Sequence, residues 1–116
     1  MPRRRWPALS PFRHMWTLVM FDLPMVTDEE RRQYTQFRKY LLGEGYFKMQ
    51  FSVYARHADS EERAKAFKRR VSDHLPPGGE VRLLLITDHQ FGKMERFTGK
   101  NTRHAGEKPP EQLTFL

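Results

Sequence analysis

The chain has 116 residues and a formal net charge of +7, from 21 lysines and arginines against 14 acidic residues. That length fits one domain and is too short for two independent hydrophobic cores. The absence of cysteine excludes disulfides, thiolate chemistry and cysteine-ligated zinc. No apolar run approaches the roughly 18 residues of a membrane span, and prolines interrupt the N-terminal stretch where a signal peptide needs a continuous apolar run. We therefore expect a soluble, cytoplasmic α+β domain with no membrane partner.

The positive charge is concentrated at the N-terminus. Four arginines and no acidic residue fall within residues 1–15, together with three prolines that break regular structure. We therefore expect residues 1–14 to form an irregular basic arm. A basic excess favours polyanionic partners, nucleic acid above all, and the 13% of aromatic residues supplies stacking surfaces. The alternative is a basic tail that only aids solubility.

The first predicted element is an apolar run over residues 15–21 (MWTLVMF), typical of a central strand covered on one or both faces. Proline ends this strand just after Asp22. The sequence TDEE at residues 27–30 is a capping box and predicts the start of a helix. Apolar residues then recur at helical spacing until the glycines at positions 43 and 45.

Residues 47–54 alternate between apolar and polar side chains, and this period of two predicts a half-buried strand. Phe51 belongs to the apolar side of the pattern and Tyr54 to the polar side. The extended stretch continues to His57, either as one long bent strand or as two short strands.

A second helix is predicted to start at Asp59 or Ser60, with two glutamates in its first turn. Its predicted buried stripe comprises Ala64, Phe67, Val71 and Leu75. The turn sequence PPGG at residues 76–79 ends this helix, and residues 81–87 (VRLLLIT) predict a third strong strand. A weaker strand is expected around residues 94–97.

The predicted order of elements fits a βαββαβ split unit over residues 15–97, an antiparallel sheet with both helices on one face. The other face must then be covered or bind something. Residues 98–116 begin as a basic loop and end in the apolar sequence EQLTFL. Because chain ends otherwise fray, we expect this last segment to dock as a strand on a partner subunit's sheet edge.

Asp22 is the first candidate for chemistry. It follows directly on a buried strand, so its carboxylate is held at a rigid sheet end, which suits a Mg²⁺ ligand. The alternative is a turn-capping role. No second acid completes a metal motif within one chain. A second carboxylate would come most simply from Asp22 of a symmetry mate across a two-fold axis.

The candidates for nucleic-acid binding gather on and just before the second predicted helix. They are Arg56, Arg63, Lys65, Lys68, Arg69 and Arg70. Contacts of this kind with phosphates position a duplex without reading its sequence. We therefore expect sequence-tolerant binding with a steep salt dependence. The alternative is an ordinary solvated helix surface.

The five histidines form no i,i+4 pair and no HExxH motif, which argues against zinc. His89 follows a predicted strand, where it could serve as an acid or base or simply lie on the surface. Ser52 has no neighbouring base in the sequence, so a serine nucleophile has little support.

Four motifs occur in order along the chain: FDLP at 21–24, YTQFRKYLLGEG at 34–45, MQFSVYAR at 49–56 and LPPGGEVRLLLIT at 75–87. Together they resemble the Cas-two family of small CRISPR-associated spacer-acquisition proteins. The resemblance spans roughly residues 15–116 and is closest to members from systems that carry the large RNA-guided nuclease. The arginine-rich arm lies outside the family pattern.

The resemblance implies a ferredoxin-like fold and a symmetric homodimer in which the C-terminal strand crosses to the partner's sheet. It implies that Asp22 is the metal-linked catalytic residue, with both copies facing each other at the interface and Mg²⁺ as cofactor. Some members are described as Mg²⁺-dependent endoribonucleases or DNases. The dimer also bridges two dimers of the CRISPR-associated integrase (Cas-one), and the assembly holds a short double-stranded DNA for insertion into the repeat array.

Two functions therefore compete. We favour a DNA-positioning subunit of the integration complex, because one acid per subunit and no evident general base make a poor nuclease. The rival is a free-standing Mg²⁺-dependent endonuclease of single-stranded RNA or double-stranded DNA, acting through paired Asp22. A third interpretation, a stand-alone RNA-binding module, would need several exposed aromatic residues on the open sheet face, where the pattern offers only Tyr54.

Overall fold

The computed structural model describes residues 14–99. Apart from residues 14, 98 and 99, the predicted N-terminal arm and C-terminal segment lie outside the described residues. The elements are β2 (Met15–Asp22), α1 (Asp28–Gly43), β3 (Phe47–Gln50), β4 (Val53–Ala58), α2 (Glu61–Ser72), β5 (Glu80–Thr87) and α3 (Asp88–Gly92). The predicted α+β class and βαββαβ order are confirmed. Among residues 14–99, no helix combines the length and apolar character needed to cross a bilayer.

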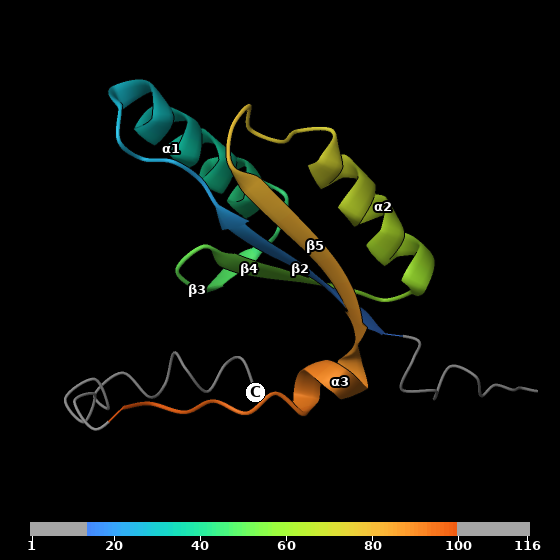
Figure 1. The fold of residues 1–116 in the computed structure, drawn as a ribbon. Coiled ribbons are helices and arrows are strands. Elements are labelled where there is room, and N and C mark those ends of the chain that lie inside the picture. Colours follow the sequence, from blue (N-terminus) through green and yellow to red (C-terminus); the bar gives the residue numbers. More distant parts are fainter. Residues whose placement is uncertain (1–13, 100–116) are drawn as a thin grey trace, which may run out of the picture.

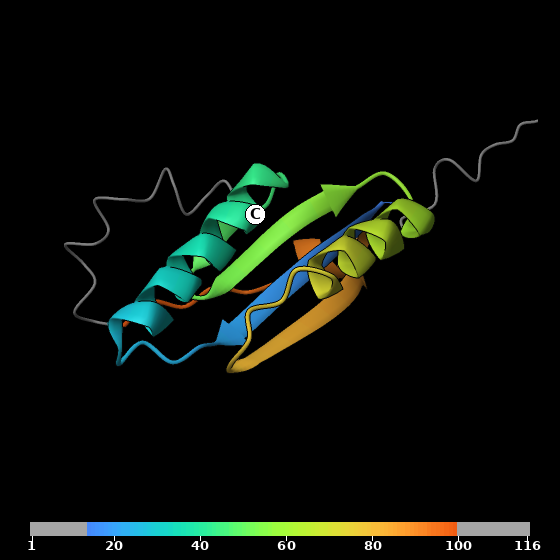
Figure 2. The ribbon, with the colours of Figure 1, turned by 90° about the horizontal axis from the view of Figure 1, so that it is seen from above.

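The strands form one four-stranded antiparallel sheet in the order β3-β4-β2-β5. The central strand β2 pairs along its length with β5 on one side and with β4 on the other. Helices α1 and α2 lie side by side over one face (Figure 2), and α3 lies on the other side at one end (Figure 1). This arrangement is consistent with the ferredoxin-like fold.

Both long helices start where the sequence predicts, at polar caps. Thr27 Oγ1 accepts a hydrogen bond from the Glu30 backbone N–H (3.1 Å), and the Glu30 carboxylate accepts one from the Thr27 N–H (3.0 Å). The hydrogen bond from the Thr27 backbone N–H to the carboxylate lowers the pKa of Glu30. At α2 the cap is Ser60, whose hydroxyl accepts from the Arg63 N–H (3.1 Å). Each cap satisfies donors that the helix itself cannot use.

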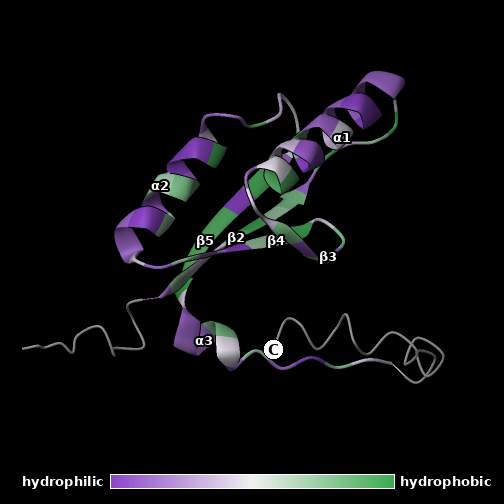
Figure 3. Cartoon of the chain, turned by 180° about the vertical axis from the view of Figure 1, so that it is seen from behind, coloured by the Kyte–Doolittle hydropathy of each residue, from purple (hydrophilic) through white to green (hydrophobic). Residues whose placement is uncertain are grey.

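The face of the sheet beneath α1 and α2 is closed. Its main core comprises Val19, Phe21, Leu23, Tyr34, Phe37, Leu41, Tyr46, Tyr54 and Val71, and a second cluster comprises Met15, Ala58, Ala64 and Phe67. Val19, Leu41 and Tyr54 are fully buried. Figure 3 shows largely apolar strands beneath helices that carry many hydrophilic residues. This face therefore holds the hydrophobic core of the domain.

The opposite face, called the open face here, is also apolar. It comprises Trp16, Leu18, Phe47, Met49, Ala55, Leu84 and Ile86. Among the described residues, α3 and the nearby Met94 cover it: the Trp16 ring stacks on Phe91 with 3.9 Å between ring centroids, and the indole N–H donates to Asp88 (2.7 Å). Leu84, away from α3, remains 48% exposed. The open face is thus covered at one end only.

The extended stretch after α1 consists of two strands, and two residues there differ from prediction. Phe51, expected on the buried apolar side, is 66% exposed because it forms the β3–β4 turn with Ser52. Tyr54, expected on the polar side, is fully buried. β4 is an inner strand, and its side chains on the helix side enter the core beneath α1.

Two further predictions are wrong. Leu75 is 47% exposed, because α2 ends at Ser72 and the buried stripe ends with it. No strand forms at residues 94–97. Instead, Thr87 and Gln90 form a reciprocal capping box that starts α3 directly after β5 and turns the chain away from the sheet.

Candidate nucleic-acid and metal site

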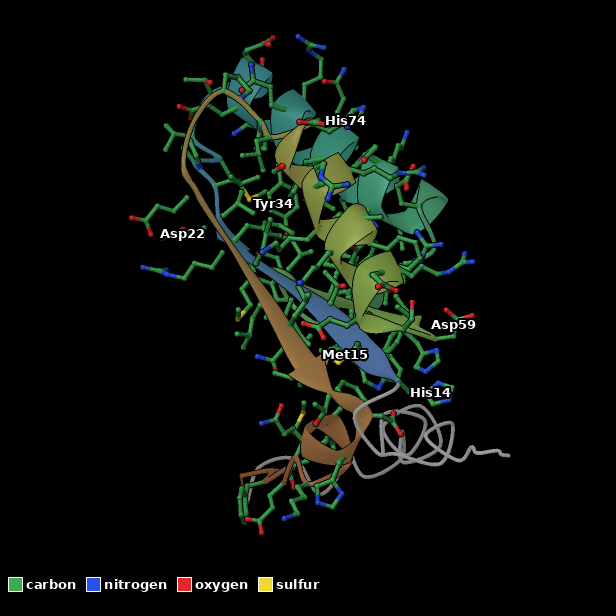
Figure 4. The ribbon with its side chains drawn as sticks, turned by 90° about the vertical axis from the view of Figure 1, so that its right-hand side faces the viewer. His14, Met15, Asp22, Tyr34, Asp59 and His74 are labelled. Carbon is green, nitrogen blue, oxygen red and sulfur yellow. The ribbon has the colours of Figure 1, made fainter. Side chains whose placement is uncertain are left out.

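Asp22 is the last residue of β2 and is exposed. Successive side chains of a strand point to opposite faces. Since Phe21 packs beneath the helices, Asp22 points to the open face. Figure 4 shows it at the far end of the sheet from His14 and Met15. The carboxylate is therefore held at a fixed sheet end, as the sequence predicts.

Glu80, which sequence analysis missed, lies directly opposite Asp22 in the β2–β5 register. Side chains in such positions share one face, with Cβ atoms about 4.5–5.5 Å apart. Glu80 forms an ion pair with Arg82 (3.2 Å), whereas Asp22 has no ion pair among residues 14–99. Only the register of two strands distant in sequence brings these carboxylates together, so no local motif could reveal the pair.

The residues at this sheet end fit a magnesium ion. Mg²⁺ commonly takes one or two protein carboxylates and completes its shell with water and substrate phosphates. Asp22 would supply one such ligand, and Glu80 would supply a second. Within residues 14–99, no three histidine, aspartate or glutamate side chains gather into a larger metal-binding group. The other ligands of such an ion would be water, phosphate oxygens or a second chain.

Gly79 fixes the backbone at this end of the sheet. Its φ of +81° lies in the left-handed region that favours glycine. A Cβ at this position would lie 2.6 Å from the Asp22 carbonyl oxygen and 2.9 Å from Leu23 Cα. The turn that leads into β5 thus approaches β2 too closely for any other residue. The position of Asp22 therefore depends on a glycine.

Of the six predicted phosphate contacts, two on α2 form exposed ion pairs with acidic residues at or just before the start of that helix. Arg63 pairs with Asp59 (3.2 Å) and Lys65 with Glu61 (3.5 Å). Exposed pairs of this kind are weak and can exchange for a phosphate. Lys68 and Arg69 are exposed and have no ion pair among residues 14–99. They are the cations of α2 most available to a nucleic acid.

The other two predicted contacts are bound to Glu44, the C-cap of α1. Arg70 forms a 2.7 Å ion pair with Glu44, and the hydrogen bond between them raises the pKa of Arg70. Arg56 lies on the helix side of β4, 3.8 Å from Glu44, with its guanidinium 3.5 Å from the ring centroid of Phe67. These contacts tie α1, α2 and β4 together. Arg56 is thus engaged inside the fold rather than on the Lys68–Arg69 surface.

Two histidines meet at the opposite end of the sheet from Asp22. His14 Nδ1 lies 3.1 Å from His57 Nε2, and the two rings stack. The pairing of β2 with β4 brings them together, and no short histidine motif in the sequence indicates it. His89 lies exposed on α3, which follows β5 at this same end. Since eight strand residues span roughly 23 Å, none of these histidines reaches Asp22.

Comparison of the sequence with known proteins identifies its family. The model of the family "CRISPR associated protein Cas2" matches residues 15–94. The chain belongs to the Cas2 family. A Cas2 relative from Parvibaculum lavamentivorans, named CRISPR-associated endoribonuclease Cas2, is 43% identical over 101 residues, which are 87% of this chain and 100% of the relative.

Two further Cas2 relatives carry the same name. The protein from Flavobacterium psychrophilum is 43% identical over 111 residues, 96% of each chain. That from Paracidovorax avenae is 40% identical over 108 residues, 93% of this chain and 99% of the relative. The range matched by the Cas2 model contains Asp22, Glu80 and all six predicted phosphate contacts.

Proposed function

We propose that two copies of this chain form the DNA-binding subunit of a CRISPR spacer-acquisition complex. The dimer holds a short DNA duplex while the CRISPR-associated integrase (Cas-one) inserts it into the repeat array. Mg²⁺ at Asp22 gives the dimer a capacity for phosphodiester hydrolysis, which is secondary to positioning. The relatives' name, endoribonuclease, is the reason to retain this activity in the proposal.

The observation that carries the proposal is the apolar open face. Leu84 is 48% exposed on a face that also carries Trp16 and Met49, and α3 covers one end only. An exposed apolar patch bordered by polar residues is typical of a protein interface. A second copy of the chain would cover it symmetrically.

The edge of the sheet supports the same pairing. Among the described residues β5 pairs with β2 alone, so its outer edge is free over all eight residues. The apolar segment at 111–116 has the length and composition of a strand that adds to such an edge. In a symmetric dimer each tail would lie on the partner's β5. The family resemblance implies that the two Asp22 carboxylates face each other at that interface.

The DNA would bind through the cationic helix layer. Lys68 and Arg69 lack intramolecular ion pairs among residues 14–99, and the chain carries a net charge of +7. If both contact phosphates, Lys68→Ala and Arg69→Ala should each reduce the slope of log K against log salt by about 0.9. Lys93→Ala, which removes the same charge just after α3 on the other side of the sheet, is the control. Equal slopes in all three variants would argue against this surface.

The second candidate function is a free-standing endonuclease, favoured by the two carboxylates at the sheet end. One comparison separates the candidates: integration of a short duplex into a repeat-bearing plasmid, with purified integrase and either wild-type or Asp22→Ala protein. The same preparations are assayed for Mg²⁺-dependent cleavage of single-stranded RNA. Asp22 is exposed, so the variant should remain a folded dimer, as sedimentation can verify.

The proposal predicts that Asp22→Ala supports full integration and loses only RNA cleavage. If integration collapses while the dimer stays folded, Asp22 and its metal belong to the integration mechanism, and the positioning role is wrong. If neither protein supports integration but the wild type cleaves RNA, the endonuclease is the better description.

A further inference from the structure

We propose that Phe51, at the tip of the β3–β4 turn, is a stacking site for an unpaired base of single-stranded nucleic acid. The site lies at the same end of the sheet as Asp22. This inference rests on the proposed function, because it assumes that a nucleic acid reaches that end of the molecule. A contact with a base would thus be added at the end of the sheet that carries the Asp22 and Glu80 carboxylates.

The turn that carries Phe51 is fastened to the end of β2. Ser52 has a φ of +63°, in the left-handed region that residues other than glycine rarely occupy. Its carbonyl accepts a hydrogen bond from the Phe21 N–H (3.0 Å), and its hydroxyl lies 3.4 Å from the Tyr34 hydroxyl. Because Asp22 follows Phe21, this hydrogen bond fixes the position of the turn relative to Asp22.

The ring of Phe51 lies against a core residue and is still largely exposed. It lies nearly parallel to the Tyr34 ring, with 6.0 Å between centroids and 21° between planes. Tyr34 is itself buried and packs edge-on against Phe21 at 5.7 Å. Phe51 nevertheless remains 66% exposed. A rigid, exposed aromatic side chain backed by the core offers a π-face to a ligand.

A cation adjoins this ring. The Lys48 ammonium lies 5.9 Å from the Phe51 ring centroid, and Lys48 is exposed. An aromatic face with a neighbouring cation is the combination that proteins use for single strands: the base stacks and the phosphate is neutralised. Bases in a duplex are already stacked on each other, so the site selects an unpaired nucleotide. Stacking of this kind tolerates any base.

Phe97 provides a matched control. It is 83% exposed, and no aromatic ring or cation lies against it among residues 14–99. If exposure alone made an aromatic residue a binding site, Phe97 would serve equally well. The supporting ring and the adjacent ammonium distinguish Phe51.

The test measures the affinity of the full-length chain for a fluorescent single-stranded RNA 12-mer and for a duplex of equal length, at fixed salt with EDTA to prevent cleavage. We expect Phe51→Ala to weaken single-strand binding by about 5- to 150-fold. Phe51→Tyr, which keeps the ring, should stay within about twofold of the wild type. Phe97→Ala should change nothing, and duplex affinity should be the same in every variant.

A second measurement does not require removal of the aromatic ring of Phe51. In Phe51→Trp protein the new indole should be quenched by a single strand, whereas the two native tryptophans provide the background in wild-type protein. Thermal unfolding and sedimentation establish that each variant is folded and has the wild-type oligomeric state.

Three outcomes would overturn the inference: Phe51→Ala binds single strands as tightly as the wild type; it loses duplex and single-strand binding alike; or it changes the oligomeric state, which would make Phe51 a protein contact. Failure of the proposed function is distinguishable, because the wild-type protein would then not bind the duplex. Wild-type duplex binding with unaltered single-strand binding by Phe51→Ala would reject only the stacking site.

Discussion

On the helix side of the sheet, Val19 and Leu41 are fully buried beneath α1 and α2, whereas Leu84 on the open face keeps 48% of its surface exposed. The same strands supply both faces, and their side chains are similarly apolar. What differs is the cover: two long helices on one side and the five-residue α3 on the other. Hydrophobic strands thus build the core of the monomer through one face and leave apolar surface exposed on the other.

The largest expected effect tests the closed face. Leu41→Ala removes a fully buried side chain and leaves a cavity, so it should lower the free energy of unfolding by about 2–5 kcal/mol. Leu84→Ala, its counterpart on the open face, should lower it by less than about 1 kcal/mol in dilute protein, where the monomer dominates. Urea unfolding measures both. Equal losses would break the distinction between the faces.

Substitution of Gly79, beside the end of β2, should lower the free energy of unfolding by nearly as much. Gly79→Ala forces a left-handed conformation on alanine and drives its Cβ into the Asp22 carbonyl, so it should cost about 2–4 kcal/mol. Gly78→Ala is the matched control, because its Cβ would meet only Pro24 at 3.8 Å. Urea unfolding of both variants provides the comparison. A tolerated Gly79→Ala would mean that the turn can move without disturbing β2.

A charge introduced on the open face tests whether a second copy packs there. Leu84→Lys introduces an ammonium where a second copy is proposed to pack, so it should weaken dimerisation by about tenfold or more. The monomer should remain folded, because Leu84 contributes little to the closed core. Sedimentation over a concentration series measures the first effect and circular dichroism the second. A dimer unaffected by this change would have to use another surface.

The stability of the closed face should also depend on pH, through Tyr46. Burial raises the pKa of Tyr46 to about 12, and its hydroxyl has no hydrogen-bond partner among the described residues. A pKa raised by folding contributes stability that is complete below about pH 10 and is lost as pH rises towards 12. Relative to its own value at pH 9, the wild type should therefore lose about 1.4 kcal/mol more than Tyr46→Phe at pH 11. Parallel curves would contradict this assignment.

The smallest effect concerns the partial cover of the open face. Thr87→Ala removes the cap of α3 and should destabilise that helix by about 1 kcal/mol. Because Trp16 stacks on Phe91 in α3, its fluorescence should shift as the helix loosens. Thr27→Ala, which removes the cap of α1, should cost a similar amount without this spectral change. A shift in both variants would mean that α3 responds to the whole fold.

Local rules predicted most of the fold. The capping box at Thr27, the helical spacing before Gly43 and the apolar run into Asp22 are properties of neighbouring residues, and each element forms where they indicate. The errors at Phe51 and Tyr54 have a non-local cause. A period of two tells which residues share a face, but the position of a strand in the sheet decides which faces are covered.

The residues of the candidate site likewise divide into those that local sequence predicts and those that only the fold brings together. Asp22 was predicted because a strand and a proline adjoin it. Glu80 was not, because only the β2–β5 register places it opposite. The pattern of cations predicted Lys68, Arg69 and Arg56 alike as phosphate contacts, yet the fold turns Arg56 onto Phe67 and Glu44. Ion pairing between distant elements is a tertiary property that the spacing of charges does not encode.

The free outer edge of β5 also bears on how the protein behaves when it is made. An edge strand with an apolar face is a template for backbone pairing with any compatible chain, and charged residues such as Arg82 only reduce that tendency. We expect solubility to depend on whether this edge is occupied. Protein that lacks residues 111–116 should therefore aggregate more readily, as its concentration rises, than protein that keeps them.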